Sequence, residues 1–274
     1  MKVSVSRYSL TSLLLIVVAV VLSALLEVVM PFPVAFFRFP LNVILFVLWG
    51  WGIVELHRAG KSCVITRYLL SRQATIVSIA LLAVGCLVMG LHTVPATDSY
   101  LFVLLNLFVI TQLAMVTLRG WRDSSGVRWL FTLCHLGLLL ALIAGFWGAP
   151  DTRIMRAELT DEPTAIALSE DGAVVQLDYK LSLADFRVDY YDNGVPSAYE
   201  ADVDIDDSRV RLAVNHPHRV GLGEHIYLTS FEQRGEAICC VVQIVHQPWR
   251  VVMFIGILLM IAGAVLLFIR GPKR

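Results

Sequence analysis

The chain has 274 residues, of which 57% are hydrophobic and 16% are charged, and its mean hydropathy is +0.73. A soluble domain carries about 25% charged residues, so the composition indicates a protein that crosses a membrane several times. The 22 basic and 22 acidic residues balance, and the basic residues form no long run, which argues against nucleic-acid binding.

Six segments have the composition of membrane-spanning helices, each of which needs about 20 mainly apolar residues. They are residues 9–30, 41–56, 74–91, 100–118, 129–148 and 251–269. The first follows Lys2 and Arg7, as the apolar part of a signal peptide would. Its apolar run is longer than that of a signal peptide and no small-residue cleavage site follows, so we expect a retained anchor.

Basic residues in the short loops predict the orientation of these spans. They occur before the first span, between the second and third, between the fourth and fifth, and after the sixth, and the opposite short loops contain only Arg38. Because cytoplasmic loops are enriched in Lys and Arg, we expect both termini in the cytoplasm. The chain is then a multi-pass protein of the inner (cytoplasmic) membrane, and residues 149–248 lie on its periplasmic or extracellular side.

Residues 149–248 change to a pattern of short strands. Runs such as AVVQLDYKLSL, FRVDYY and RVRLAV are rich in Val, Leu and Tyr, and turn sequences such as Asp192-Asn193-Gly194 separate them. This pattern predicts a small antiparallel β-sandwich. The expected fold is therefore a polytopic α-helical membrane protein with six transmembrane helices and a small extracytoplasmic β domain between helices 5 and 6. Its parts are residues 1–148 with five helices, the β domain 149–248, and 249–274 with the sixth helix and a cytoplasmic tail.

The fifth span, residues 129–148, contains one histidine, His135. It lies seven residues beyond Arg128, about 10 Å into the cytoplasmic half of the bilayer. An ionisable residue inside a span is costly and suggests a function. At 100° per residue, the small residues of this span fall on the side opposite His135, where they suit close helix packing. They are Gly137, Ala141, Ala144 and Gly148.

Two interpretations of His135 remain open from the residues alone. It faces Leu138, Leu139, Leu142 and Phe146, which suggests a groove, a cofactor or a partner subunit beside it. Alternatively, it donates a hydrogen bond to a carbonyl or serine of a neighbouring span and has only a structural role. Asn106 and Gln112 in the fourth span are expected to be interhelical hydrogen-bond partners of this structural kind.

Several ordered motifs resemble the ResB (CcsB) family of cytochrome c biogenesis system II. The strings are TLCHLGLLLALIAGFWGAPD, LSLADFRVDYYDNGVPSAYEADVDI and VNHPHRVGLGEHIYLTSF, followed by QPWRVVMFIGILLMIAGAVLLF. They cover about half of the chain. Typical members have four spans and a much larger extracytoplasmic domain, so this chain resembles the short ResB-like variants.

The resemblance implies a role in binding, moving or presenting haem for attachment to apocytochrome c, together with a CcsA-type membrane partner. His135 matches the family's membrane histidine, a proposed axial ligand of haem iron, and neutral imidazole is an ordinary ligand of that metal. His92, at the outer end of the third span, is a candidate second haem contact. The partner's tryptophan-rich haem motif is absent here, which implies a non-catalytic subunit.

The remaining reactive residues suggest no further chemistry. We expect a surface turn rather than a metal site at His216, His218 and His225, because no Cys or carboxylate cluster accompanies them. The five cysteines form no CxxC pair and are expected to pack in the core or at an interface. No nucleophile–base pair or phosphate-binding loop is visible. The alternative function is a membrane-anchored scaffold whose β domain binds a partner protein without a cofactor; a transporter is disfavoured because no inverted repeat is visible.

Overall fold

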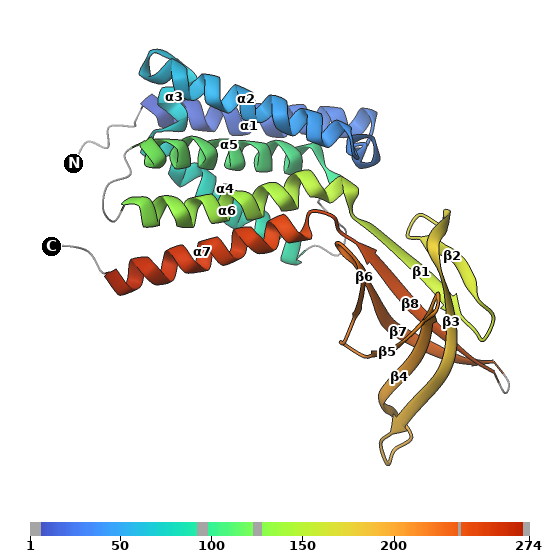
Figure 1. Cartoon of the computed structure of the whole chain (residues 1–274). Coiled ribbons are helices and arrows are strands. Elements are labelled where there is room, and N and C mark those ends of the chain that lie inside the picture. Colours follow the sequence, from blue (N-terminus) through green and yellow to red (C-terminus); the bar gives the residue numbers. More distant parts are fainter. Residues whose placement is uncertain (1–6, 92–97, 123–127, 235–236, 271–274) are drawn as a thin grey trace. The chain divides into compact units, whose positions relative to one another are not determined.

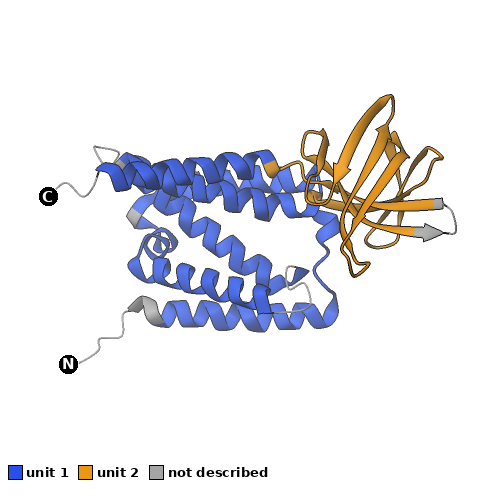
Figure 2. Cartoon of the chain, turned by 90° about the horizontal axis from the view of Figure 1, so that it is seen from below, with its two compact units in different colours: residues 1–150, 251–274 blue, residues 151–250 orange. Residues whose placement is uncertain are grey.

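A computed structural model describes residues 7–91, 98–122, 128–234 and 237–270. The chain forms two compact units (Figure 2). One comprises Met1–Pro150 together with Val251–Arg274, and the other comprises Asp151–Arg250. The two units are described separately below.

The first unit is helical (Figure 1). Its long helices are α1 (Arg7–Val29), α2 (Leu41–Ala59), α4 (Arg72–Leu91), α5 (Tyr100–Arg122), α6 (Arg128–Gly148) and α7 (Arg250–Arg270). These six helices are long and apolar enough to cross a membrane, and each contains most of one segment that the sequence predicts as a span. The sequence did not predict the short helix α3 (Val64–Leu69), whose residues Thr66, Tyr68 and Leu69 are buried.

Helix α5 is the centre of this unit. In its apolar window 44% of the residues are buried, against 11% in each of α1, α2, α4 and α7. Two polar contacts connect it to its neighbours: Gln112 Nε2 donates to Thr75 Oγ1 of α4 at 2.9 Å, and Trp49 Nε1 of α2 donates to Thr111 Oγ1 at 3.0 Å. The interhelical role predicted for Gln112 is confirmed.

The interhelical role predicted for Asn106 is wrong. Its Nδ2 donates a 2.9 Å hydrogen bond to the Phe102 carbonyl oxygen, four residues back in the same helix. A backbone carbonyl of the preceding turn is always within reach of a short polar side chain, so the amide is satisfied without a second helix.

The second unit is one antiparallel sheet with the strand order β5-β4-β3-β2-β1-β8-β7-β6. The strands are β1 (Arg153–Leu159), β2 (Thr164–Ser169), β3 (Val174–Tyr190), β4 (Pro196–Ile205), β5 (Ser208–Ala213), β6 (His218–Gly221), β7 (Glu224–Arg234) and β8 (Ala237–His246). The predicted turns form between them, and Gly172, Gly194 and Asn215 have positive φ angles of 81°, 78° and 64°. Glycine and asparagine reach this conformation at low cost.

The two layers of the expected sandwich are halves of this single sheet. Strands β3 and β7 are four places apart in the order, yet the ring centroids of Phe186 and Phe231 are 4.9 Å apart. Tyr199 of β4 donates a 2.8 Å hydrogen bond to the Thr229 carbonyl oxygen of β7. The prediction of an antiparallel β unit is confirmed, but two separate sheets are not formed, because β1 pairs along its whole length with β8 and joins the halves. The enclosed core includes Leu159, Leu181, Leu212, Ile226, Val242 and Ile244.

Candidate functional site

His135 lies on α6, two turns from its first residue, and is half-buried. Its Nδ1 is 2.8 Å from the Phe131 carbonyl oxygen. A carbonyl oxygen only accepts hydrogen bonds, so Nδ1 carries the proton, and in a neutral imidazole the lone pair then lies on Nε2. No described residue forms a hydrogen bond with Nε2. The geometry therefore leaves one nitrogen of His135 able to accept a proton or a metal.

This hydrogen bond differs from the one that the structural interpretation of His135 predicted, which was to a carbonyl or serine of a neighbouring span. The acceptor belongs to the preceding turn of the same helix and not to a neighbouring span. Such a bond orients the imidazole without joining two helices. A ring held in this way by a carbonyl is the usual arrangement of a metal-binding histidine.

Aromatic side chains flank His135 towards the beginning of α6. The ring of Phe131 lies against the imidazole in a tilted arrangement, with 3.8 Å between centroids and 34° between planes. Phe131 is 46% exposed and Trp129 is 42% exposed, whereas Leu139, one turn beyond His135, is buried. His135 thus lies at the border between the helical core and the apolar surface of its unit.

The opposite side of α6 packs tightly against α7. A Cβ added to Gly256 would lie 2.6 Å from the Ala141 nitrogen and 2.7 Å from the Gly137 oxygen. One added to Gly263 would lie 2.8 Å from the Cys134 nitrogen. Figure 1 shows the two helices side by side. The prediction that small residues of α6 support close packing within the protein is confirmed for Gly137 and Ala141, and helical periodicity places His135 away from this contact.

The second candidate haem contact, His92, lies outside the described residues. The described histidines of the sheet unit are not grouped with each other. His216 is exposed in the turn after β5, and within the described parts of the chain no three His, Cys, Asp or Glu side chains are placed to hold a metal ion.

A polar cluster that the sequence did not reveal joins β3, β7 and β8. Tyr179 donates a 2.6 Å hydrogen bond to Glu224 Oε1, and His246 Nδ1 lies 2.9 Å from Glu224 Oε2. Burial, followed by the hydrogen bond to the Glu224 carboxylate, raises the pKa of Tyr179 well above its usual value. Nearby, burial and then the charge of Arg250 lower the pKa of His225. Tyr179 is 45 positions from Glu224, and His246 is 22 positions from it, so no local signal indicated that the three side chains meet.

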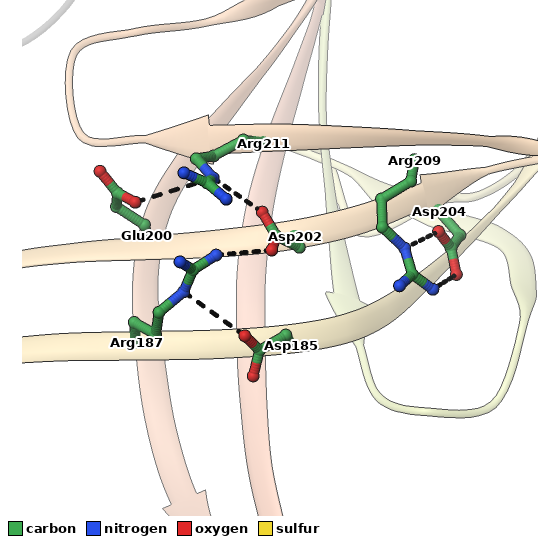
Figure 3. Close-up of polar contacts among 7 residues, drawn as sticks. All are labelled: Asp185, Arg187, Glu200, Asp202, Asp204, Arg209 and Arg211. Carbon is green, nitrogen blue, oxygen red and sulfur yellow. Dashed lines mark hydrogen bonds and ion pairs between the residues drawn. The ribbon is translucent and has the colours of Figure 1, made fainter.

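Alternating charges form a network on the exposed face of β3, β4 and β5 (Figure 3). Asp202 is at its centre: Arg187 Nη2 lies 2.5 Å from Asp202 Oδ2, and Arg211 Nε lies 3.0 Å from Asp202 Oδ1. The hydrogen bond from Arg211 and then the charge of Arg187 lower the pKa of Asp202. Cross-strand pairs of opposite charge stabilise a sheet modestly.

Replacing Asp202 by Asn is expected to accelerate amide hydrogen exchange in residues 196–213 by about two- to fivefold at neutral pH. A carboxyl group with a lowered pKa in the folded state contributes stability above its unfolded pKa of about 3.9 and loses it as the pH falls through the folded value. The difference between the two proteins should therefore disappear in acid. Hydrogen exchange of the full chain, compared at matched pH, measures it. Asp207→Asn, a matched change in the exposed β4–β5 turn, should leave exchange unaltered, and an equal effect of both substitutions would contradict the role of the network.

The adjacent cysteines are both buried in β8. Cys240 is in the sheet core, where burial raises the pKa of its thiol to about 12, and Cys239 Sγ lies 3.9 Å from Glu158 Oε2. Both are free thiols, as are Cys63, Cys86 and Cys134. A thiol that stays protonated is a poor nucleophile, so packing is the role that the structure supports for Cys240.

Comparison with known proteins relates the chain to one family. Residues 126–242 match the ResB-like family, and this range includes α6 with His135 and most of the sheet unit. No curated protein sequence matches the chain. A solved structure described as "Cytochrome c Heme Lyase CcmF" is similar at 13% identity with a TM-score of 0.40. The similar region covers 71% of this chain and 34% of that one, so the chain spans about a third of its length.

Proposed function

We propose, from the premise that residues 126–242 are a ResB-like region, that the protein is a membrane subunit of a cytochrome c maturation apparatus. In this role it helps to bind, move or present haem for attachment to apocytochrome c. The resemblance to the ResB family implies this function, and the site on α6 is the part of the chain that best fits it. The family relation carries the function, and the geometry of His135 supports the cofactor.

His135 has the properties that an axial haem ligand requires. Its Nδ1 donates to the Phe131 carbonyl, so Nε2 is the nitrogen that would bind iron. Phe131 and the neighbouring leucines offer an apolar surface to the porphyrin. A bound haem would supply the iron and the vinyl groups, while this chain would orient one axial ligand and exclude water around it.

The proposal is tested by purifying the protein with a CcsA-type partner and recording its visible spectrum. The wild-type complex should show a Soret band. His135→Gly should lower haem affinity by at least about tenfold, because second-shell changes alone cost that much at metal sites. Added imidazole should restore the band in His135→Gly. His57→Ala, at the end of α2, is the matched control and should keep the wild-type spectrum.

Two results would contradict the proposal, and they concern different parts of it. Equal haem content and ligation in the wild type and His135→Gly would remove His135 from the site. A wild-type complex without haem would remove the cofactor from this subunit altogether, and the docking function described below would then replace it.

The sidedness of the chain is part of the proposal. Both termini and the loop with Cys63 are assigned to the cytoplasm of a cell with an inner membrane, and the sheet unit to the opposite side, because the basic residues of the short loops favour this orientation. A membrane-impermeant maleimide should label Cys63 only after the membrane is permeabilised. Labelling of Cys63 in intact cells would show that the chain has the opposite orientation.

The alternative function is a membrane-anchored scaffold that binds a partner protein through its sheet and holds no cofactor. The observation that favours it is that Asp151–Arg250 form a compact unit with a core of their own. In that case deletion of residues 153–247 should abolish capture of the CcsA-type partner or of apocytochrome c, while His135 substitutions should have no effect.

A further inference from the structure

Strand β3 is longer than the strand beside it. Its 17 residues pair with β2 only between Val174 and Leu181, and from Leu181 onwards they pair with β4. Beyond Leu183, whose amide donates to the Thr160 carbonyl oxygen, β3 and β4 continue together as an arm that ends in the Asp192-Asn193-Gly194 turn (Figure 1). Strand β5 lies beside β4 in this arm as far as Glu200, and the rest of the arm has two strands. The arm therefore has a free edge on the β3 side.

The free edge comprises Asp185 to Tyr190. Residues 185–189 pair in a regular register with residues 202–198 of β4. The register shifts on either side of this stretch, before Asp185 and after Asp189. Within the described chain, no backbone hydrogen bond connects them to any strand other than β4. Asp185, Arg187, Asp189 and Tyr190 are exposed. Backbone groups along such an edge are a template for pairing with another extended chain.

The two edges of the arm are not equally open. On the β4 side, the unpaired residues begin with Pro196, which has no amide hydrogen to donate, and from Glu200 onwards β5 covers the strand. Proline and short length are common ways of blocking an edge. The β3 edge has neither a proline nor a covering strand, so it is the edge that can accept a partner.

Aromatic residues lie beside the free edge. Phe186 of β3 is half-buried against Phe231, which in turn contacts Tyr199 with 5.2 Å between ring centroids. At the end of the arm, Tyr190 and Tyr191 are 59% and 62% exposed. In strand addition the main chain provides affinity, and alternate side chains of the added strand contact the face beside the edge. Here that face is aromatic.

The charge around the edge is negative. Residues 184–200 contain Asp185, Asp189, Asp192 and Glu200 but only one basic residue, Arg187. Arg187 is paired with both Asp185 and Asp202. Asp189 and Asp192 form no ion pair with any described residue. The arm therefore favours a cationic partner strand and disfavours an acidic one.

We propose that the β3 edge from Asp185 to Tyr190 binds an extended, positively charged polypeptide segment by adding it as a strand to the sheet. The segment runs along β3, with apolar side chains on the Phe186, Tyr199 and Phe231 face and basic side chains near Asp189 and Asp192. This binding surface is independent of His135 and does not require that the chain hold haem.

The test uses the full-length protein in phosphatidylcholine nanodiscs and a fluorescein-labelled dodecapeptide of alternating lysine and valine. Binding is followed by fluorescence anisotropy at low ionic strength. The peptide should bind saturably. The same peptide N-methylated at every residue keeps its charge and side chains but has no amide hydrogen with which to pair with an edge, and it should not bind. A glutamate–valine peptide should not bind either.

Matched variants locate the site. Asp189→Asn combined with Asp192→Asn removes two charges beside the edge and should weaken binding about three- to tenfold, since exposed charge pairs each contribute modestly. Glu162→Gln combined with Glu170→Gln removes two exposed charges near β2 and should leave binding unchanged. A benzophenone amino acid in place of Tyr190 should cross-link the peptide, whereas one in place of Leu222 in the β6–β7 turn should not.

Each contrary result overturns the proposal in a defined way. Equal binding of the N-methylated peptide would mean that charge alone attracts the peptide. Equal effects of the two charge-removing pairs would place the peptide elsewhere. A stable dimer that dissociates when peptide is added would mean that a second copy of this chain occupies the edge. None of these outcomes bears on the Soret band that tests His135.

Discussion

Replacing Gly137 by leucine is expected to separate α6 from α7 and to destabilise the helical unit. An added Cβ at this position would collide with the Met260 nitrogen and lie 2.6 Å from the Gly256 oxygen, both of which are backbone atoms of α7 that cannot move aside alone. Overpacking of this kind costs about 1–3 kcal/mol and more where backbone is involved. The melting temperature of the detergent-solubilised protein, measured by fluorescence-detected size exclusion, should fall.

Gly145→Leu is the matched control for this change. It lies on the same helix, and an added Cβ there meets no atom within 4 Å. Leucine is also a better helix former than glycine, so the control should be neutral or slightly stabilising. Equal melting temperatures of Gly137→Leu and Gly145→Leu would disprove the α6–α7 contact.

Leu181→Ala should produce the largest loss of stability in the sheet unit. Leu181 is fully buried and lies at the point where β3 pairs with Thr164 of β2 on one side and Ile205 of β4 on the other. Deleting its side chain leaves a cavity at this junction, and such changes cost about 2–5 kcal/mol. Thermolysin should therefore cleave between residues 153 and 246 at a temperature lower by about 10 °C or more.

Ile166→Ala provides the comparison within the same sheet. Ile166 is 56% exposed, so its truncation should change stability by less than about 0.5 kcal/mol. If both variants became equally sensitive to thermolysin, the assignment of Leu181 to the core would be incorrect.

The sequence predicted the spans well because the signal for each is local. A run of apolar residues is sufficient to identify a span, and all six runs correspond to long helices. The helix α3 was missed because six residues carry no comparable run, and its burial depends on contacts such as the 2.8 Å hydrogen bond between Tyr68 Oη and Ser12 Oγ of α1. Asn106 and Gln112 look alike in sequence, and only the position of Thr75 distinguishes them.

The sheet illustrates the same limit. Alternation of residues predicted strands and turns, and these formed. The pairing of β1 with β8 joins residues more than 80 positions apart and converts two expected sheets into one. The contact of Tyr179 with Glu224 depends on that closure, whereas Glu224 and His246 are already cross-strand neighbours in β7 and β8. Long-range pairing of this kind has no local signature in the sequence.

The sequence by itself determined that His135 lies inside an apolar helix, opposite a stripe of small residues, and that a β unit follows it. These properties depend on helical periodicity and hydropathy, which act over a few residues. Only the tertiary structure decided that α7 packs on the side of the small residues, that no described residue forms a hydrogen bond with Nε2 of His135, and that β3 extends beyond β2 with a free edge. Each of these depends on which distant segment packs beside which, and that choice is made by the burial and hydrogen bonding of the whole chain.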